Sequence, residues 1–266
     1  MCIRDRISLL VATAGRPPLR TLLWVVVAMV GARSAAMAFN RLVDRHHDAA
    51  NPRTADRHLP VGAVSVAGTA FFTGLGAALL VLASAMLNPL CLMLSPVALA
   101  VVLGYSFMKR FSALAHLVLG FGLAIAPVGA WLAARGEFAP FPLWLAAGVM
   151  FWVAGFDTIY GIQDVEFDRR AGLHSLASRL GVARALIVSR VCHVLAVACV
   201  AAAVRRADPL GIVSLVGVGV MAGLLAWEQA IVRSGDMRHI DKAFFTINSW
   251  VGMILLAVVL VDLYAL

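Results

Sequence analysis

The chain has 266 residues, of which 62% are hydrophobic and only 14% are charged, whereas water-soluble domains carry about 45–50% apolar and about 25% charged residues. This composition excludes a soluble globular fold and predicts an integral membrane protein. The net charge of +8 does not indicate binding to nucleic acid, because the basic residues are spread over short loops and form no patch interleaved with aromatic side chains.

The N-terminal region contains a short apolar stretch, ISLLVATAG, between MCIRDR and Arg16. Nine residues rise only about 14 Å in a helix, against a hydrocarbon core of about 30 Å. The Gly-Arg-Pro-Pro sequence that follows does not resemble the small-residue cleavage site of a signal peptide. We therefore expect a truncated first helix, with MCIRDR foreign to the family sequence.

Apolar blocks of about 20 residues follow, the length that an α-helix needs to cross the hydrocarbon core. The shorter alternating segments typical of a membrane barrel do not occur in this sequence. The sequence predicts an all-α, polytopic transmembrane bundle that forms one integral-membrane domain over residues 1–266. The eight expected spans are 19–39, 61–86, 90–107, 113–134, 141–163, 182–204, 209–232 and 243–264.

Lysine and arginine are distributed unequally between loops that alternate along the chain. Thirteen lie in the loops 41–57, 109–110, 169–184 and 233–242, and five lie in 16–20, 135 and 205–206. Because cytoplasmic loops are enriched in lysine and arginine, the first set is predicted to lie on the cytoplasmic side of a bacterial-type inner membrane.

Two acidic segments follow spans that end on this side. In the first, NRLVDRHHDAANPRTADR at 40–57, a helix continued from the preceding span at 100° per residue places four polar side chains on one face. They are Arg33, Asn40, Asp44 and Asp48.

The second acidic segment is DTIYGIQDVEFDRR, which begins at Asp157. Asp164 and Asp168 lie seven and eleven residues after Asp157, the same offsets at which Asn40 and Asp44 follow Arg33. The three carboxylates of the second segment therefore also share a helical face. The two sets are expected at similar depth, facing one another. A solvated charged loop is the alternative, but clustered acids near membrane depth with a shared spacing favour a functional site.

Several carboxylates in one place would repel and would not all ionise without a cation among them. Oxygen ligands suit Mg²⁺, which is usually held by a few carboxylates together with substrate phosphates, whereas the soft ligands that zinc prefers are missing. Arg53, Arg57 and Lys109 lie in adjacent loops, where they could hold phosphate oxygens. The sequence thus predicts a site for Mg²⁺ and a diphosphate.

Arg33 lies roughly two turns inside an apolar helix, where an arginine needs an anionic partner. Two hypotheses stay open: an internal salt bridge with a site aspartate, or a role in binding the carboxylate of a substrate. His46 and His47 lie off the acidic face and are interpreted as surface residues.

With these residues identified, the chain resembles the UbiA superfamily of intramembrane aromatic prenyltransferases. Asn40-x3-Asp44-x3-Asp48 and the following NPRTADRHLPVG are similar to its first motif. YGIQDVEFDRRAGLHSLASRLG, at 160–181, resembles the second motif, and YSFMKR, at 105–110, resembles the element between them.

The resemblance implies nine helices and a lateral opening for a prenyl chain. The eight predicted spans match this number only if the first helix is missing. The resemblance also implies that the residues that bind the metal and the diphosphate are Asn40, Asp44, Asp48, Asp164 and Asp168. It further implies that Arg53, Arg57 and Lys109 bind diphosphate, and that Tyr105 and Asp157 lie beside the reacting carbon. Asn40-Arg41 departs from the Asn-Asp that ubiquinone-type members often show.

The implied activity is Mg²⁺-dependent transfer of a polyprenyl group from polyprenyl diphosphate to a hydroxylated aromatic acid, similar to 4-hydroxybenzoate, in quinone biosynthesis. Membrane lipids would surround the enzyme, and no obligate protein partner is evident. A naphthoate-type acceptor stays open, as does an ion-coupled transporter, because helical bundles with buried charges also describe carriers. A phospholipid-forming alcohol transferase is disfavoured, since its DGxxAR element is absent from this sequence.

Overall fold

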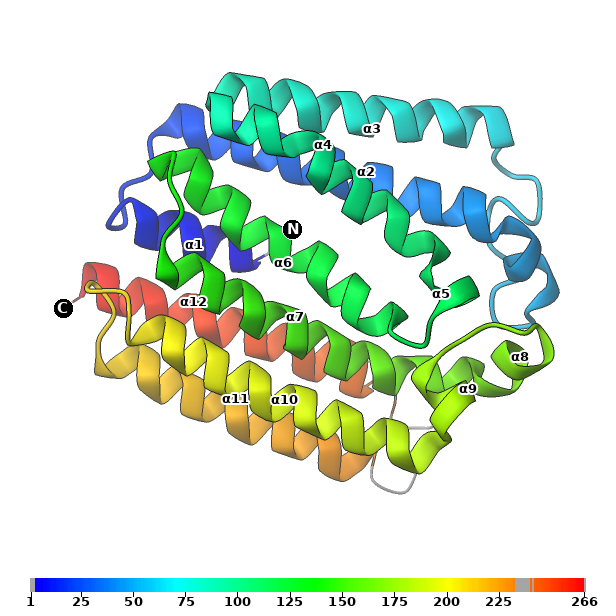
Figure 1. The fold of residues 1–266 in the computed structure, drawn as a ribbon. Helices are drawn as coiled ribbons and strands as arrows, with labels where there is room; N and C mark the ends of the chain where they lie inside the picture. Colours follow the sequence, from blue (N-terminus) through cyan, green and yellow to red (C-terminus); the bar gives the residue numbers. More distant parts are fainter. Residues whose placement is uncertain (1–2, 233–239, 241, 266) are drawn as a thin grey trace.

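The structure is a computed structural model that describes residues 3–232, 240 and 242–265, and these residues form helices and turns without a strand (Figure 1). Three short segments interrupt or extend the α-helices: 3₁₀ turns at Tyr105–Phe107 and Ile162–Asp164, and a π-helix at Lys242–Ile247. The α-helices are α1 (Ile3–Ala12), α2 (Leu19–Ala50), α3 (Val66–Leu87), α4 (Pro89–Gly104), α5 (Met108–Phe111), α6 (Ala115–Arg135), α7 (Pro140–Gly161), α8 (Val165–Arg170), α9 (Leu176–Leu180), α10 (Val182–Val204), α11 (Ile212–Ile231) and α12 (Asn248–Tyr264).

Eight helical segments of the described chain are long and apolar enough to cross a membrane, which confirms the predicted number. As expected, α2 continues without a break through the first motif to Ala50. The next span begins at Val66 and not at residue 61, because residues 51–64 form turns and the Ser65 side chain caps the first turn of α3. A serine side chain at this position accepts a hydrogen bond from a backbone N–H that the helix itself leaves unpaired.

The short apolar stretch at the N-terminus forms α1, a helix of ten residues. It packs against α6 and α12 and buries Leu9 in the core, and the hydroxyl of Ser8 donates a hydrogen bond of 2.6 Å to the carbonyl of Pro127 in α6. Because ten residues rise only about 15 Å, α1 fills a space between longer helices and does not itself cross the bundle. The truncation of this helix stays a prediction.

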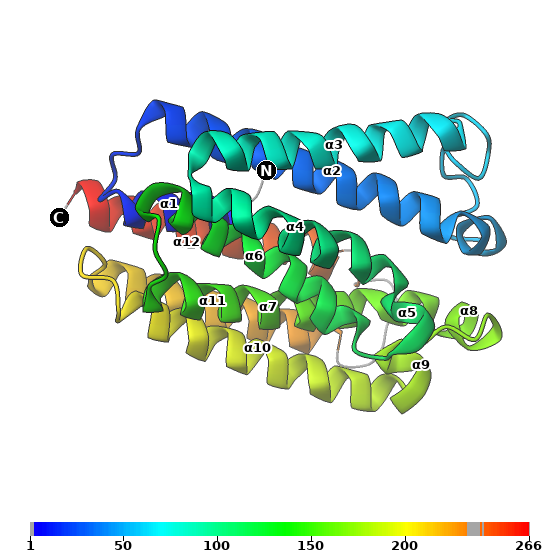
Figure 2. The same ribbon diagram turned by 45° about the horizontal axis from the view of Figure 1, so that its top comes forward.

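The connections at the two ends of the bundle differ in chemistry. The α2–α3 loop, α5, α8 and α9 lie at one end, and the α1–α2, α6–α7 and α10–α11 turns lie at the other (Figures 1 and 2). The predicted basic loops 41–57, 109–110 and 169–184 therefore share one end, whereas the fourth, 233–242, lies mostly outside the described residues. Both acidic motifs reach this same end.

Helices α6 and α7 come close together at Gly120, where an added Cβ would lie only 2.3 Å from the carbonyl oxygen of Met150. Small residues allow helix backbones to approach this closely in a membrane. The contact bears on the site described below, because α6 carries His116 one turn before Gly120 and α7 carries Asp157 two turns after Met150.

We therefore expect Gly120→Ala to lower the free energy of unfolding by about 1–3 kcal/mol, the usual cost of overpacking. Gly129→Ala, on the same helix, is the matched control, because a Cβ there meets nothing within 4 Å and alanine favours helix by up to about 1 kcal/mol over glycine. Thermal unfolding in detergent measures both. Equal melting temperatures for the two variants would contradict the close approach.

Candidate active site

A cavity of ≈ 270 Å³ opens at the end of the bundle that holds the acidic motifs. Its size is close to the lower end of the roughly 300–1,000 Å³ that small-ligand pockets occupy. Side chains from α2, the α2–α3 loop, α5, α6, α7 and α8 line it. The predicted site residues among them are Asn40, Asp44, Asp48, Arg53, Arg57, Tyr105, Lys109, Asp157, Asp164 and Asp168.

Arg33 is the predicted site residue that does not line this cavity. It is exposed on α2 and lies seven residues before Asn40, a rise of about 10 Å along the helix axis. The prediction from helical periodicity correctly placed it on the face of Asn40 but ignored this difference in depth. Arg33 forms no ion pair with any described residue, so the hypothesis of an internal salt bridge is wrong, and the substrate-carboxylate role stays a prediction.

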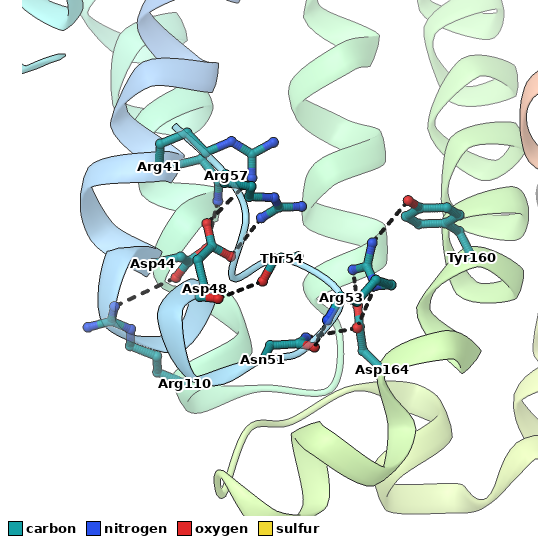
Figure 3. Close-up of polar contacts among 11 residues, drawn as sticks. Arg41, Asp44, Asp48, Asn51, Arg53, Thr54, Arg57, Arg110, Tyr160 and Asp164 are labelled. Atoms are coloured by element: carbon teal, nitrogen blue, oxygen red, sulfur yellow. Dashed lines mark hydrogen bonds and ion pairs between the residues drawn. The ribbon is translucent and has the colours of Figure 1, made fainter. Parts of the chain in front are cut away.

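The first motif is held by the loop that follows it, which folds back over the end of α2 (Figure 3). Arg57 donates a hydrogen bond of 2.6 Å from Nη1 to Oδ1 of Asp48, and the hydroxyl of Thr54 donates to the Asp48 carbonyl at 3.0 Å. One turn earlier, Asn40 donates from Nδ2 to Oδ2 of Asp44 at 2.9 Å. Both carboxylates are thereby fixed where they line the cavity.

The same loop reaches across to the second motif. Arg53 donates from Nε and Nη2 to the two carboxylate oxygens of Asp164 at 2.9 and 2.5 Å, and from Nη1 to the Tyr160 hydroxyl at 3.1 Å (Figure 3). Asn51 donates a further bond of 3.0 Å to Asp164. The hydrogen bonds with Asp164 raise the pKa of the Arg53 guanidinium above its usual value. This bidentate pair joins α2 and its loop to the end of α7.

The second motif does not form the continuous helix assumed in the sequence analysis. Residues Ile162–Asp164 form a 3₁₀ turn between α7 and α8, which tightens the chain before Asp168. Gly172, with φ of 68°, then reverses the chain after α8, and the N–H of His174 donates to the carbonyl of Lys109 at 2.7 Å. Despite the break, Asp168 lines the cavity and is almost fully buried.

Each of the five aspartates that line the cavity has its own basic partner. The pairs are Asp44 with Arg110 (3.7 Å), Asp48 with Arg57 (2.6 Å), Asp157 with His116 (2.7 Å), Asp164 with Arg53 (2.5 Å) and Asp168 with Lys109 (3.8 Å). Arginine and lysine side chains therefore offset the repulsion among four of these carboxylates, so repulsion alone does not require a metal. No three His, Cys, Asp or Glu side chains of the described chain are grouped closely enough to hold a metal by themselves.

The site nevertheless fits a hard cation that binds together with a phosphate ligand. Oδ2 of Asp48 and Oδ2 of Asp168 are both buried without a hydrogen-bond partner, although ion-pair partners lie 3.6 and 3.8 Å away. Buried polar oxygens normally have a partner, so such atoms need an explanation. Carboxylate oxygens in small number, completed by phosphate oxygens and water, are the usual surroundings of Mg²⁺.

Some cavity residues were missed by the sequence analysis. His116 is a polar residue in the otherwise apolar start of α6, and this isolated position is the sequence feature that could have identified it as a site residue. Arg110 was counted only as a loop charge, and Arg41, the departure from the family motif, lies 3.6 Å from Asp48. His47 also lines the cavity, which corrects its interpretation as a surface residue, whereas His46 is exposed as predicted.

Comparison with known proteins agrees with this geometry. The sequence model of the UbiA prenyltransferase family matches residues 7–250. The chain is 34% identical to a 4-hydroxybenzoate octaprenyltransferase of Nitrosospira multiformis over 96% of this chain and 87% of the relative. It is 31% identical to a 4-hydroxybenzoate octaprenyltransferase of Vibrio cholerae over 97% of this chain and 89% of the relative.

Two solved structures share the fold. A UbiA homolog from Aeropyrum pernix K1 superposes with a TM-score of 0.88 at 36% sequence identity, covering 98% of this chain and 96% of that chain. A UbiA homolog from Archaeoglobus fulgidus, bound to GPP and Mg²⁺, superposes with a TM-score of 0.71 at 18% identity, covering 96% of this chain and 95% of that chain. At 18% identity the second structure supports the fold alone.

Proposed function

Because the chain belongs to the UbiA prenyltransferase family, we propose that it transfers a polyprenyl group from polyprenyl diphosphate to a hydroxylated aromatic acid such as 4-hydroxybenzoate, in a quinone pathway. The observation that supports this most directly is the cavity in which both acidic motifs meet five arginine and lysine side chains. The relatives named 4-hydroxybenzoate octaprenyltransferase support the acceptor. The transporter alternative is set aside, since the family is one of transferases.

The diphosphate is proposed to bind at Arg53, Arg57 and Lys109. Their side chains are 31%, 28% and 38% exposed, so each can reach a ligand in the cavity while it stays close to its aspartate. Guanidinium groups match the geometry of phosphate oxygens and can bind two at once, and the lysine adds a point charge. The basic loops at this end of the bundle support a cytoplasmic position for the site.

Magnesium is proposed to bind at Asp48 and Asp168, whose buried Oδ2 atoms lack hydrogen-bond partners, with Asn40, Asp44 and Asp164 as the neighbouring oxygen donors. When bound, Mg²⁺ neutralises charge on the departing diphosphate. The choice of metal rests on these oxygen donors, which suit a hard cation bound together with phosphate. The protein's own contribution is to hold these oxygens in place before the substrate arrives.

The reaction that we propose begins when the allylic C–O bond breaks and its electron pair leaves with the diphosphate, which the three cations hold. The resulting allylic cation would react with water in an open site, so water has to be excluded. Leu119, Phe167 and Leu173 line the cavity and provide an apolar wall. The aromatic ring then attacks the cation, and we place Tyr105 and Asp157 beside the reacting carbon.

We expect transfer to require a divalent cation, with Mg²⁺ or Mn²⁺ active and Zn²⁺ inactive, because the proposed ligands are all oxygen donors. The measurement is product formation by mass spectrometry in membranes supplied with a polyprenyl diphosphate and either 4-hydroxybenzoate or a dihydroxynaphthoate. Undiminished transfer after exhaustive chelation would rule out the metal. Transfer to the naphthoate alone would replace the proposed acceptor.

A further inference from the structure

His116 is a cavity residue to which neither acidic motif assigns a role. It lies in the first turn of α6, its side chain is 2% exposed, and its Nδ1 lies 2.7 Å from Oδ2 of Asp157 on α7. The ring also packs on α7 at Gly161, where an added Cβ would lie 2.8 Å from Cε1 of the imidazole. Two contacts with α7 thus fix the imidazole where it lines the cavity.

A second buried histidine shows what a purely structural role looks like in this protein. His193 on α10 is 3% exposed, and its Nδ1 lies 3.1 Å from Nε2 of Gln229 on α11. It has no acidic partner in the described chain and does not line the cavity. His116 differs in both respects.

Asp157 also differs from the other cavity aspartates. Asp44, Asp48, Asp164 and Asp168 are paired with arginine or lysine, which stay charged at physiological pH. Histidine can be neutral at physiological pH. Asp157 is 21% exposed, and its Oδ1 has no hydrogen-bond partner among the described residues. It is therefore the carboxylate best placed to accept a proton from a bound substrate.

We propose that His116 is the positioning residue that holds Asp157 as the proton acceptor of the transfer reaction. Nδ1–H of His116 donates to Oδ2 of Asp157, which fixes the carboxylate and leaves Oδ1 free to face the substrate. A general base has to lie within hydrogen-bond reach of the proton that it removes, and this contact sets that position.

This proton removal rests on the proposed function, and it follows the formation of the carbon–carbon bond between the prenyl group and the aromatic ring. The ring carbon that has bonded to the prenyl group still carries a hydrogen, and the ring carries the positive charge. The C–H bond breaks, its electron pair restores the aromatic ring, and the proton moves to Oδ1 of Asp157, which becomes a neutral carboxylic acid. His116 keeps its own proton throughout, and the proton on Asp157 passes to water after the product leaves.

The test compares His116→Leu with His116→Asn. The two new side chains have nearly the same shape, but only the amide of asparagine can place an N–H where Nδ1 lies. We expect His116→Leu to lower kcat roughly 10- to 100-fold, less than the 10²–10⁴-fold contribution of a general base itself, with the KM for prenyl diphosphate unchanged. His116→Asn should retain most of the activity, and His193→Gln is the control for loss of a buried imidazole outside the cavity.

A kinetic isotope effect separates this role from a structural one. With an acceptor deuterated at the ring position that receives the prenyl group, His116→Leu is expected to turn over more slowly than with the protiated acceptor, because proton removal has become rate-limiting. If His116→Leu does not fold, His116→Gln replaces it, since its amide lies one methylene farther out and is expected to show the same isotope effect. Equal kcat in the leucine and asparagine variants, or a loss without an isotope effect, would overturn the proposal. If the wild-type protein transfers no prenyl group, the proposed function fails instead.

Discussion

Asp164→Asn is expected to lower kcat/KM for prenyl transfer by about 10²–10⁴-fold, because it removes a charge worth several kcal/mol in the transition state. The same change takes away the bidentate partner of Arg53, whose Nε and Nη2 both donate to this carboxylate. Asparagine keeps the volume of the side chain, so no cavity is created. The measurement is the initial rate of transfer at matched membrane abundance.

Asp56→Asn is the matched control for this loss. Asp56 lies in the same α2–α3 loop region as Arg53, but it is exposed and does not line the cavity. It should therefore retain wild-type activity. Comparable activity in the two variants would show that the carboxylate of Asp164 has no part in transfer.

Arg33→Gln is expected to raise the KM for the aromatic acceptor roughly 10- to 150-fold, the effect of losing a charged hydrogen bond worth about 1.5–3 kcal/mol. Arg33 lies in the apolar part of α2, a helix long and apolar enough to cross a membrane, and forms no ion pair in the described chain. A cation at this depth needs an anion, and the acceptor carboxylate is the anion that we propose. The KM for prenyl diphosphate should stay unchanged.

The two substrates are varied in turn for Arg33→Gln, for Arg33→Lys and for a control. Lysine should rescue only partly, because it cannot offer two parallel donors to one carboxylate. Arg45→Gln is the control, since Arg45 is an exposed arginine on the same helix whose Nη1 donates to the carbonyl of Leu42 in its own helix. An unchanged acceptor KM together with a raised prenyl diphosphate KM would discard the carboxylate role.

The sequence by itself determined the architecture, since apolar blocks of about 20 residues leave the chain few alternatives to crossing a membrane. Eight such segments occur where they were predicted, with shifts of a few residues at Val66 and elsewhere. Alternation of loops richer and poorer in lysine and arginine placed both acidic motifs at one end. Helical periodicity then identified the cavity faces of Asp44 and Asp48 correctly, because a helix fixes the direction of its side chains over short distances.

Helical periodicity gives the direction of a side chain around the axis of its own helix. It gives neither the position of that side chain along the axis relative to the cavity nor its contacts with another helix. Arg33 therefore shares the face of Asn40 yet lies about 10 Å along the axis from it, outside the cavity. The 3₁₀ turn at Ile162–Asp164 could not be derived from ideal spacing either, and it changed the path to Asp168.

Only the tertiary structure decided how the charges are paired. Arg53 and Asp164 are 111 residues apart in the sequence, and His116 and Asp157 are 41 apart, so no local pattern relates them. The first pair forms because the α2–α3 loop folds across to the end of α7. The second forms because Gly120 lets α6 approach the backbone of α7. Ion pairs and hydrogen bonds depend on separations of a few ångströms between side chains, and such separations between helices are set by packing.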